Sequence, residues 1–233
     1  MKLYNKKAAR IRRAPRIKKG FTLVELLVVI AIISALAGLS YGPIMKQLNA
    51  AERIEAISNA RSINTTLLVF YAQNDGNYPS EVTDLRNHGV TTANLLFQQI
   101  LDSGHRDSEK FFWNSSNAKA GLGDINQPDE NGTLTEGENV WDYVMNLTAD
   151  DGSKPIFYDS NTGGSTFTAE TWDGKAVIAL VDGAVSAEFI NYTGPLEPTP
   201  GNFAMGPVNN NAGVDILSEA NLPTAAVIVP RTD

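Results

Sequence analysis

The sequence predicts an α+β protein in which one long N-terminal helix packs its C-terminal half on a small antiparallel β-sheet. Three observations support this prediction. An apolar run begins at Phe21 and continues into an amphipathic pattern that ends near Asn74. Short segments rich in Val, Ile, Phe and Tyr recur in the second half of the chain, as expected for strands. The dipeptide Asp182-Gly183 between two of these segments is typical of a two-residue hairpin turn.

The N-terminal region combines a basic arm with an apolar segment. Residues 1–20 contain nine Lys or Arg and no acid, and residues 21–39 carry a single charge, at Glu25. Nineteen helical residues at about 1.5 Å each nearly cross the ~30 Å hydrocarbon core of a bilayer. A basic block before such a helix predicts that its N-terminal end stays in the cytoplasm. Glu25 stands out because a carboxylate near the bilayer centre costs roughly 2.5–3.5 kcal/mol, which marks it as a candidate functional residue.

The residues Lys18 to Glu25, K-K-G-F-T-L-V-E, carry a family resemblance. They resemble the N-terminal signal of type IV pilins and type II secretion pseudopilins. The resemblance implies that a prepilin peptidase cuts between Gly20 and Phe21, that Phe21 is then N-methylated, and that Glu25 serves filament assembly. It is unbroken over the motif and extends, with less specificity, to about Pro79.

Two other interpretations of the apolar segment stay open. Ala35-Leu36-Ala37 satisfies the small-x-small rule for a secretory signal peptide, which would be cut after Ala37. A plain membrane anchor is the second alternative. Against the signal peptide, Glu25 would interrupt its apolar region, and the helical pattern continues past the supposed cut. Gly20, Phe21, Glu25 and the basic arm occur together, which favours the prepilin interpretation.

The second part of the predicted helix is amphipathic. Its apolar positions recur at three- to four-residue spacing with one gap, at Ala60, and its charged residues occupy the other face. The predicted apolar face consists of Ile44, Leu48, Ala51, Ile54, Ile57, Ile63, Leu67 and Phe70. Pro43 predicts either a kink or melted turn, or only a modest bend. Residues 74–79 contain a signal for the C-terminal end of the helix. Tyr71, Gly76, Tyr78 and Pro79 fit a short motif found in many pseudopilins.

The rest of the chain predicts a globular head of about 155 residues, which is enough for a core. A short helix is expected at 92–101, a strand or helix fragment at 110–113, and a loop at 121–139. The apolar segment 140–147 is too short to be assigned to a helix or a strand. Strands are expected at 154–159, 176–181 and 185–190, with one more at 225–229 whose place in the sheet the sequence does not fix. The stretch 193–213 is rich in Pro, Gly and Asn.

Charge and cysteine content narrow the function classes. Without the nine basic residues of the leader, 10 bases face 26 acids, a balance of −16, which argues against a nucleic-acid partner. The chain contains no cysteine. An exported fold of this kind therefore relies on its core. Many type IV pilins have a C-terminal disulfide, so its absence favours the pseudopilin branch of the resemblance.

The sequence offers little for catalysis. Its two histidines, His88 and His105, stand in polar contexts away from any nucleophile motif, so we predict that the protein is not an enzyme. No cofactor is predicted, although calcium stays an open option with no ligands assigned. Hard oxygen ligands are available in three acidic loops, Asp124–Asn131, 150–152 and 159–161. The first does not keep the EF-hand spacing, because Pro128 stands where the third ligand should be.

These observations predict a structural subunit of a pseudopilus or type IV pilus-like filament, most readily in type II protein secretion. The alternatives are a pilin for adhesion, motility or DNA uptake, and a membrane-anchored binding domain that never polymerises. The expected parts are a leader (1–20), a long helix (21–75, with 21–39 in the membrane or filament core) and a head (76–233). The resemblance implies prepilin peptidase, other pilin subunits and an inner-membrane assembly machinery as partners. It also implies an inner-membrane precursor with a periplasmic head, and later a filament.

Overall fold

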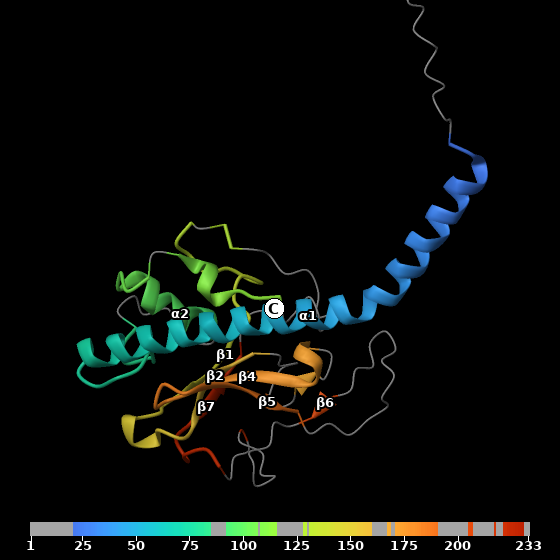
Figure 1. Ribbon diagram of the computed structural model, residues 1–233. Coiled ribbons are helices and arrows are strands. Elements are labelled where there is room, and N and C mark those ends of the chain that lie inside the picture. Colours follow the sequence, from blue (N-terminus) through green and yellow to red (C-terminus); the bar gives the residue numbers. More distant parts are fainter. Residues whose placement is uncertain are drawn as a thin grey trace, which may run out of the picture. The chain divides into compact units, whose positions relative to one another are not determined.

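The computed structural model describes residues 21–84, 92–106, 108–115, 128–129, 131–159, 167–168, 171–190, 205–206, 217 and 221–230. The leader and Gly20 lie outside these residues. The chain divides into two units, residues 1–45 and 46–233. The helix α1, Leu23–Gln73, is 51 residues long and contributes to both (Figure 1). The fold is therefore α+β and pilin-like, as predicted, with a long N-terminal helix and a small antiparallel sheet.

Helix α1 remains helical through Pro43, so the melted turn considered from the sequence is not present. It ends at Gln73, where the backbone N–H of Gly76 donates to the carbonyl of Tyr71 (3.0 Å). Gly76 has φ 78°, and a Cβ there would lie 3.3 Å from the Tyr71 hydroxyl. Tyr71 in turn packs on Tyr78, with 4.6 Å between ring centroids. The Tyr-Gly-Tyr-Pro phrase thus has a physical role in closing the helix end.

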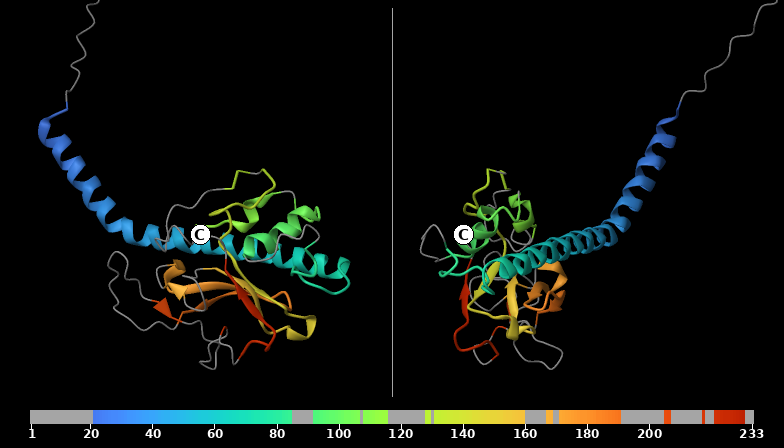
Figure 2. Two further views of the ribbon diagram at one scale, coloured as in Figure 1. Left: turned by 180° about the vertical axis from the view of Figure 1, so that it is seen from behind. Right: turned by 90° about the vertical axis from the view of Figure 1, so that its left-hand side faces the viewer.

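The head contains one main sheet of five antiparallel strands in the order β5-β4-β2-β1-β7. Its strands are β1 (Asp142–Met145), β2 (Pro155–Tyr158), β4 (Lys175–Leu180), β5 (Val185–Phe189) and β7 (Val227–Val229). A two-stranded ribbon pairs β3 (Phe167–Thr168) with β6 (Met205–Gly206). The helix α2, Ala93–Asp102, and residues 46–73 of α1 lie on one side of the main sheet (Figures 1 and 2). Three short 3₁₀ helices complete the described head: Glu109–Phe112, Ala149–Asp151 and Thr171–Asp173.

The core joins α1, α2 and the sheet. Along α1 its members are Ala56, Ala60, Ile63, Leu67 and Phe70, each at most 3% exposed. Phe97 of α2 makes edge contacts with the rings of Tyr143 (5.5 Å) and Phe157 (5.9 Å) on neighbouring strands. Asn64 of α1 donates through Nδ2 to the carbonyl of Leu180 on β4 (2.8 Å). The predicted packing of the helix's C-terminal half on the sheet is confirmed.

The predicted apolar face of α1 was partly wrong. Leu48 and Ile54 are 47% and 66% exposed, and Ala51 is exposed as well. Ala60, which looked like a gap in the pattern, is fully buried. Small alanines allow the head to approach the helix closely, so they belong to the buried face even though they add little to an apolar pattern.

The hairpin between β4 and β5 is present, but its turn is longer than predicted. Ala179 pairs with Val185, and Leu180 exchanges backbone hydrogen bonds with Gly183 and Ala184. The loop therefore has three residues, with Gly183 at φ 94° in the left-handed position that ends such turns. The Asp-Gly signal located the turn correctly, but the glycine follows a type I-like turn and does not fill a two-residue one.

Candidate functional site

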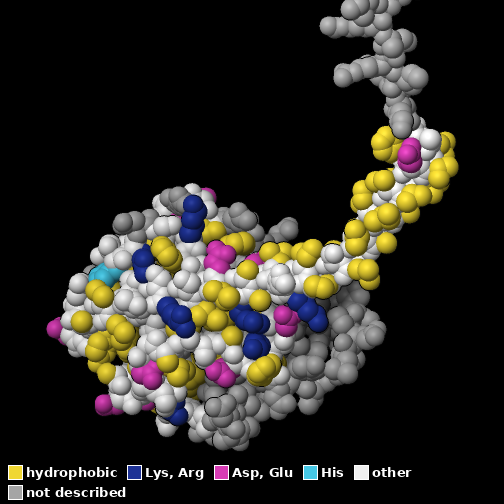
Figure 3. Space-filling view, in the orientation of Figure 1, with side chains coloured by type: hydrophobic (Ala, Val, Ile, Leu, Met, Phe, Trp, Pro, Cys, Tyr) yellow, Lys and Arg dark blue, Asp and Glu magenta, His cyan; other side chains and the backbone are white. Residues whose placement is uncertain are grey.

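The first part of α1 presents apolar side chains to its surroundings on all sides. Apolar side chains cover its visible surface (Figure 3). By residue, the large apolar side chains from Phe21 to Leu48 are all at least 38% exposed in the single chain. They are Phe21, Leu23, Val24, Leu26, Leu27, Val28, Val29, Ile30, Ile32, Ile33, Leu36, Leu39, Tyr41, Ile44, Met45 and Leu48. Such a surface requires lipid or other apolar helices around it.

Among the described residues, α1 is the one helix long and apolar enough to cross a membrane, by length and composition. None of its apolar window is buried, so this window, unlike residues 56–70 of the same helix, does not belong to the core of the head. This property suits membrane anchoring of the N-terminal part.

Glu25 lies in the first turn of α1 and caps the helix. Its Oε2 accepts hydrogen bonds from the backbone N–H of Thr22 (2.8 Å) and from the Thr22 hydroxyl (2.8 Å). The backbone N–H of Glu25 donates to the same hydroxyl (3.2 Å). Thr22 immediately precedes the helix, so the two residues form a reciprocal capping box. All the hydrogen bonds recorded for the carboxylate use Oε2, which leaves Oε1 available for another donor.

The capping role of Glu25 was not predicted from the sequence, although the sequence contains the signal for it. Thr22-Leu23-Val24-Glu25 has the Thr-x-x-Glu spacing of a capping box ahead of an apolar run. The carboxylate therefore has partners inside its own chain. Phe21, the predicted first residue after cleavage, is 79% exposed. Gly20, the other side of the predicted cut, lies outside the described residues.

The carboxylates of the three acidic loops differ in the groups that they contact. Asp159 is fully buried, and its carboxylate accepts from Asn114 Nδ2, Trp172 Nε1 and the Val177 backbone N–H at 2.8–3.2 Å. Asp151 accepts from Thr148 in a second capping box. Of the loop at 124–131, Pro128, Asp129 and Asn131 are described. Asp159 and Asp151 thus have structural hydrogen bonds, and Asp129 is the residue that joins other carboxylates.

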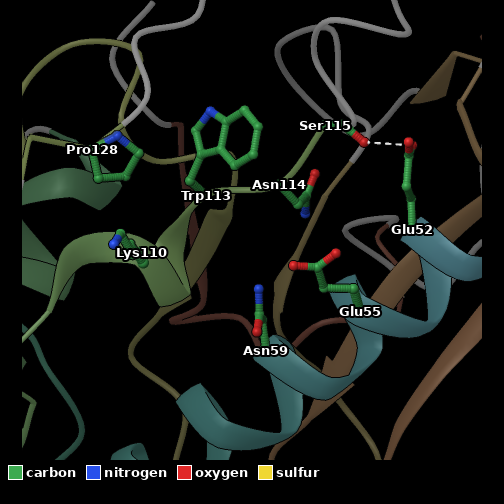
Figure 4. Close-up of a pocket in the computed structure, with 8 residues that line it drawn as sticks. All are labelled: Glu52, Glu55, Asn59, Lys110, Trp113, Asn114, Ser115 and Pro128. Atoms are coloured by element: carbon green, nitrogen blue, oxygen red, sulfur yellow. Dashed lines mark hydrogen bonds between the residues drawn. The ribbon is translucent and has the colours of Figure 1, made fainter.

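A pocket of about 380 Å³ lies in the head (Figure 4). Glu52, Glu55 and Asn59 of α1 form one wall, and Ser115 donates to Glu52 (2.9 Å). The other lining residues are Lys110, Trp113, Asn114 and Pro128. None of these eight described residues is a histidine. Of the two histidines, His105 lies against the Phe70 ring (5.9 Å), and His88 lies outside the described residues.

Comparison with protein families gives one match. Residues 15–41 match the prokaryotic N-terminal methylation motif. This motif is characteristic of type IV pilins and pseudopilins, and it supports a pilin-like precursor. The match includes the predicted cleavage site, Phe21 and Glu25. No curated protein and no solved structure matches the chain significantly.

Proposed function

We propose that the protein is a structural subunit that prepilin peptidase processes and that polymerises through the N-terminal part of α1 into a pseudopilus or pilus-like filament. The observation that carries this proposal is the exposed apolar surface of the N-terminal part of α1, which lies inside a methylation motif and contains the capping residue Glu25. A bilayer accounts for about twenty of these residues. Tyr41, Ile44 and Leu48 lie beyond that length and are also exposed. Apolar helices of neighbouring subunits would cover both groups.

In this proposal Glu25 sets the axial position of each subunit relative to its neighbours in the filament. Cleavage before Phe21 would create an α-amine, a cation that the precursor lacks at this position. At ~4 Å and an effective dielectric constant of ~20, its attraction to a neighbour's carboxylate is about 4 kcal/mol before desolvation. The capping box orients the Glu25 carboxylate, and Oε1 is available to the incoming amine. The precursor is therefore held in the inner membrane with its head periplasmic until cleavage activates it.

Within this class we propose the pseudopilus of type II secretion. The absence of cysteine and the Tyr-Gly-Tyr-Pro phrase at the end of α1 support it. Loss of the gene would then leave exoproteins in the periplasm. A loss of motility, adhesion or DNA uptake with secretion intact would contradict the secretion role and favour a pilin.

The test compares two variants that disturb the same capping box. Glu25→Gln removes the charge, so we expect the yield of sheared filaments to fall by more than about tenfold, because each 1.4 kcal/mol lost is a factor of ten. Thr22→Ala removes the capping hydroxyl and keeps the charge, and its cost should stay near 1 kcal/mol of helix stability. Intact mass of each variant checks that processing still occurs.

The alternatives predict other results. Equal loss in both variants would mean that Glu25 acts as a cap and not as the assembly carboxylate. Normal filaments with Glu25→Gln would contradict the proposed register. Absence of filaments from the unaltered protein, with the head exported, would favour a membrane-anchored domain that does not polymerise.

A further inference from the structure

The pocket in the head lies outside the surface that the proposed function uses. It is formed between α1 and residues 110–115, and its volume of about 380 Å³ is at the small end of the range for ligand sites, roughly 300–1,000 Å³. Glu52, Glu55 and Asn59 are spaced by three and four residues, so their side chains share one face of α1. Figure 4 shows them directed toward the opposite wall, which carries Trp113.

Trp113 is the aromatic side chain among the eight that line the pocket. Of the three tryptophans in the chain, Trp141 and Trp172 are fully buried in the core, whereas Trp113 is only partly buried. The π-system of an indole is negative on its face, so it attracts the slightly positive C–H groups of a ligand that stacks on it. A partly exposed tryptophan in a cavity therefore favours a ligand that has a flat face of C–H groups.

The remaining polar side chains of the pocket supply hydrogen-bonding groups of both kinds. The carboxylates of Glu52 and Glu55 accept, and the ammonium group of Lys110 donates. The carboxamide of Asn59 does both. The two carboxylates and the ammonium group largely offset one another in charge, so the lining suits a neutral ligand. A sugar hydroxyl also donates and accepts, and a sugar ring presents C–H groups on its faces, so a saccharide matches both parts of the lining.

The wall opposite α1 is held in place by hydrogen bonds. Asn114 is 5% exposed, and its Nδ2 donates to the fully buried carboxylate of Asp159 (3.2 Å). The hydroxyl of Ser115 donates to Glu52 (2.9 Å) and so connects this wall to α1. Both bonds are present without a ligand. The pocket is therefore preformed, which reduces the entropy lost when a ligand binds.

We propose that this pocket binds a short neutral saccharide, whose pyranose ring stacks on Trp113 and whose hydroxyls bond to Glu55 and Asn59. Sugars of the glucose type suit it because their ring substituents are equatorial. The C–H groups then lie on the ring faces, toward the indole, and the hydroxyls point outward to the polar side chains. The site gives the head a carbohydrate-binding function that is separate from filament assembly.

The experiment uses the full chain in a zwitterionic detergent, because a detergent with a sugar headgroup would compete for the site. Isothermal titration calorimetry with cellobiose and with N,N′-diacetylchitobiose should show saturable binding of at least one of them. Acrylamide quenching of the tryptophan fluorescence should decrease at saturation, because the ligand covers the partly exposed Trp113. Sorbitol, which has hydroxyls but no ring to stack, should do neither. Arginine tests the rival ligand, a cation bound between Glu52 and Glu55, and it should not bind.

Three variants test the assignment of the pocket. Trp113→Ala should weaken saccharide binding by at least about tenfold, because the stacking surface is lost. Asn59→Ala, which removes one hydrogen bond and little packing, should weaken it by about fivefold and decides the matter if Trp113→Ala does not fold. Ser58→Ala is the matched control, an exposed neighbour on α1 outside the pocket, and should bind as the unaltered protein does.

The proposal is overturned if neither saccharide binds, if arginine binds in their place, or if the folded pocket variants bind as the control does. Filament formation plays no part in these measurements, so the result is independent of the proposed function.

Discussion

One helix, α1, has two surfaces of different character. From Phe21 to Leu48 its large apolar side chains are exposed, whereas from Ala56 to Phe70 one apolar face is buried in the head. Both parts are rich in aliphatic residues, so hydrophobicity alone does not explain the difference. It lies in periodicity: the first part is apolar all round, and the second is apolar on one side. A helix of this kind needs two environments, its own head for one part and lipid or other subunits for the other.

One polar side chain from each part illustrates the difference. Ser40 donates to the carbonyl of Leu36 in its own helix (2.8 Å). Asn64 donates across to the carbonyl of Leu180 on the sheet (2.8 Å). Hydroxyls of the second part, those of Thr65 and Thr66, also bond within the helix, but the longer amide of Asn64 joins the helix to the sheet.

The largest difference is expected when leucine is truncated in each part. Leu67 is fully buried and Leu36 is 60% exposed. Leu67→Ala should cost about 2–5 kcal/mol of head stability because it leaves a cavity. Leu36→Ala should change it by less than about 0.5 kcal/mol. Urea unfolding of the full chain in detergent, followed by tryptophan fluorescence, measures both.

The two leucine substitutions should have the opposite order of effect on filament assembly. Leu36→Ala removes apolar surface that neighbouring helices would cover, so it should reduce filament yield more than its effect on the head suggests. Equal destabilisation of the head by both variants would contradict the division of α1 into two surfaces.

A smaller difference is expected between the two polar residues. Asn64→Ala removes the hydrogen bond to Leu180, but the Leu180 carbonyl keeps the N–H of Gly183 (3.1 Å). The expected cost is therefore only about 1 kcal/mol. Ser40→Ala should be close to neutral for the head, since its bond lies within its own helix. The same urea series measures both, and a larger loss from Ser40→Ala than from Asn64→Ala would reverse the comparison.

Much of the fold could be predicted because its signals are local. The bounds of α1 and α2 came within a few residues, since both have clear periodic patterns and a stop or cap. The β4–β5 hairpin followed from its Asp-Gly turn. The predicted strand at 225–229 is present as β7, and it pairs with β1 at the edge of the sheet.

What the sequence could not provide depends on tertiary contacts. All four residues of β1 are buried, so the strand shows no alternation to mark it. Glu109, Asp129 and Glu138 come together through a 3₁₀ helix and irregular chain, where the sequence spacing carries no information. The capping box at Glu25 is visible in the Thr-x-x-Glu spacing, but the spacing does not show which donors of other chains the carboxylate meets. Both cases show that a carboxylate has to be judged by the donors around it.

The central claim is that the mature chain begins at a cleaved and methylated Phe21, two residues before α1, and the N-terminus of the mature protein tests it most directly. Intact mass and N-terminal sequencing of protein from sheared filaments or inner membranes should give N-methyl-Phe21, with residues 1–20 removed. A mature chain that begins at Gly38 would mean a secretory signal peptide, and one that retains Met1 would mean a simple anchor. Either of these results would contradict the account.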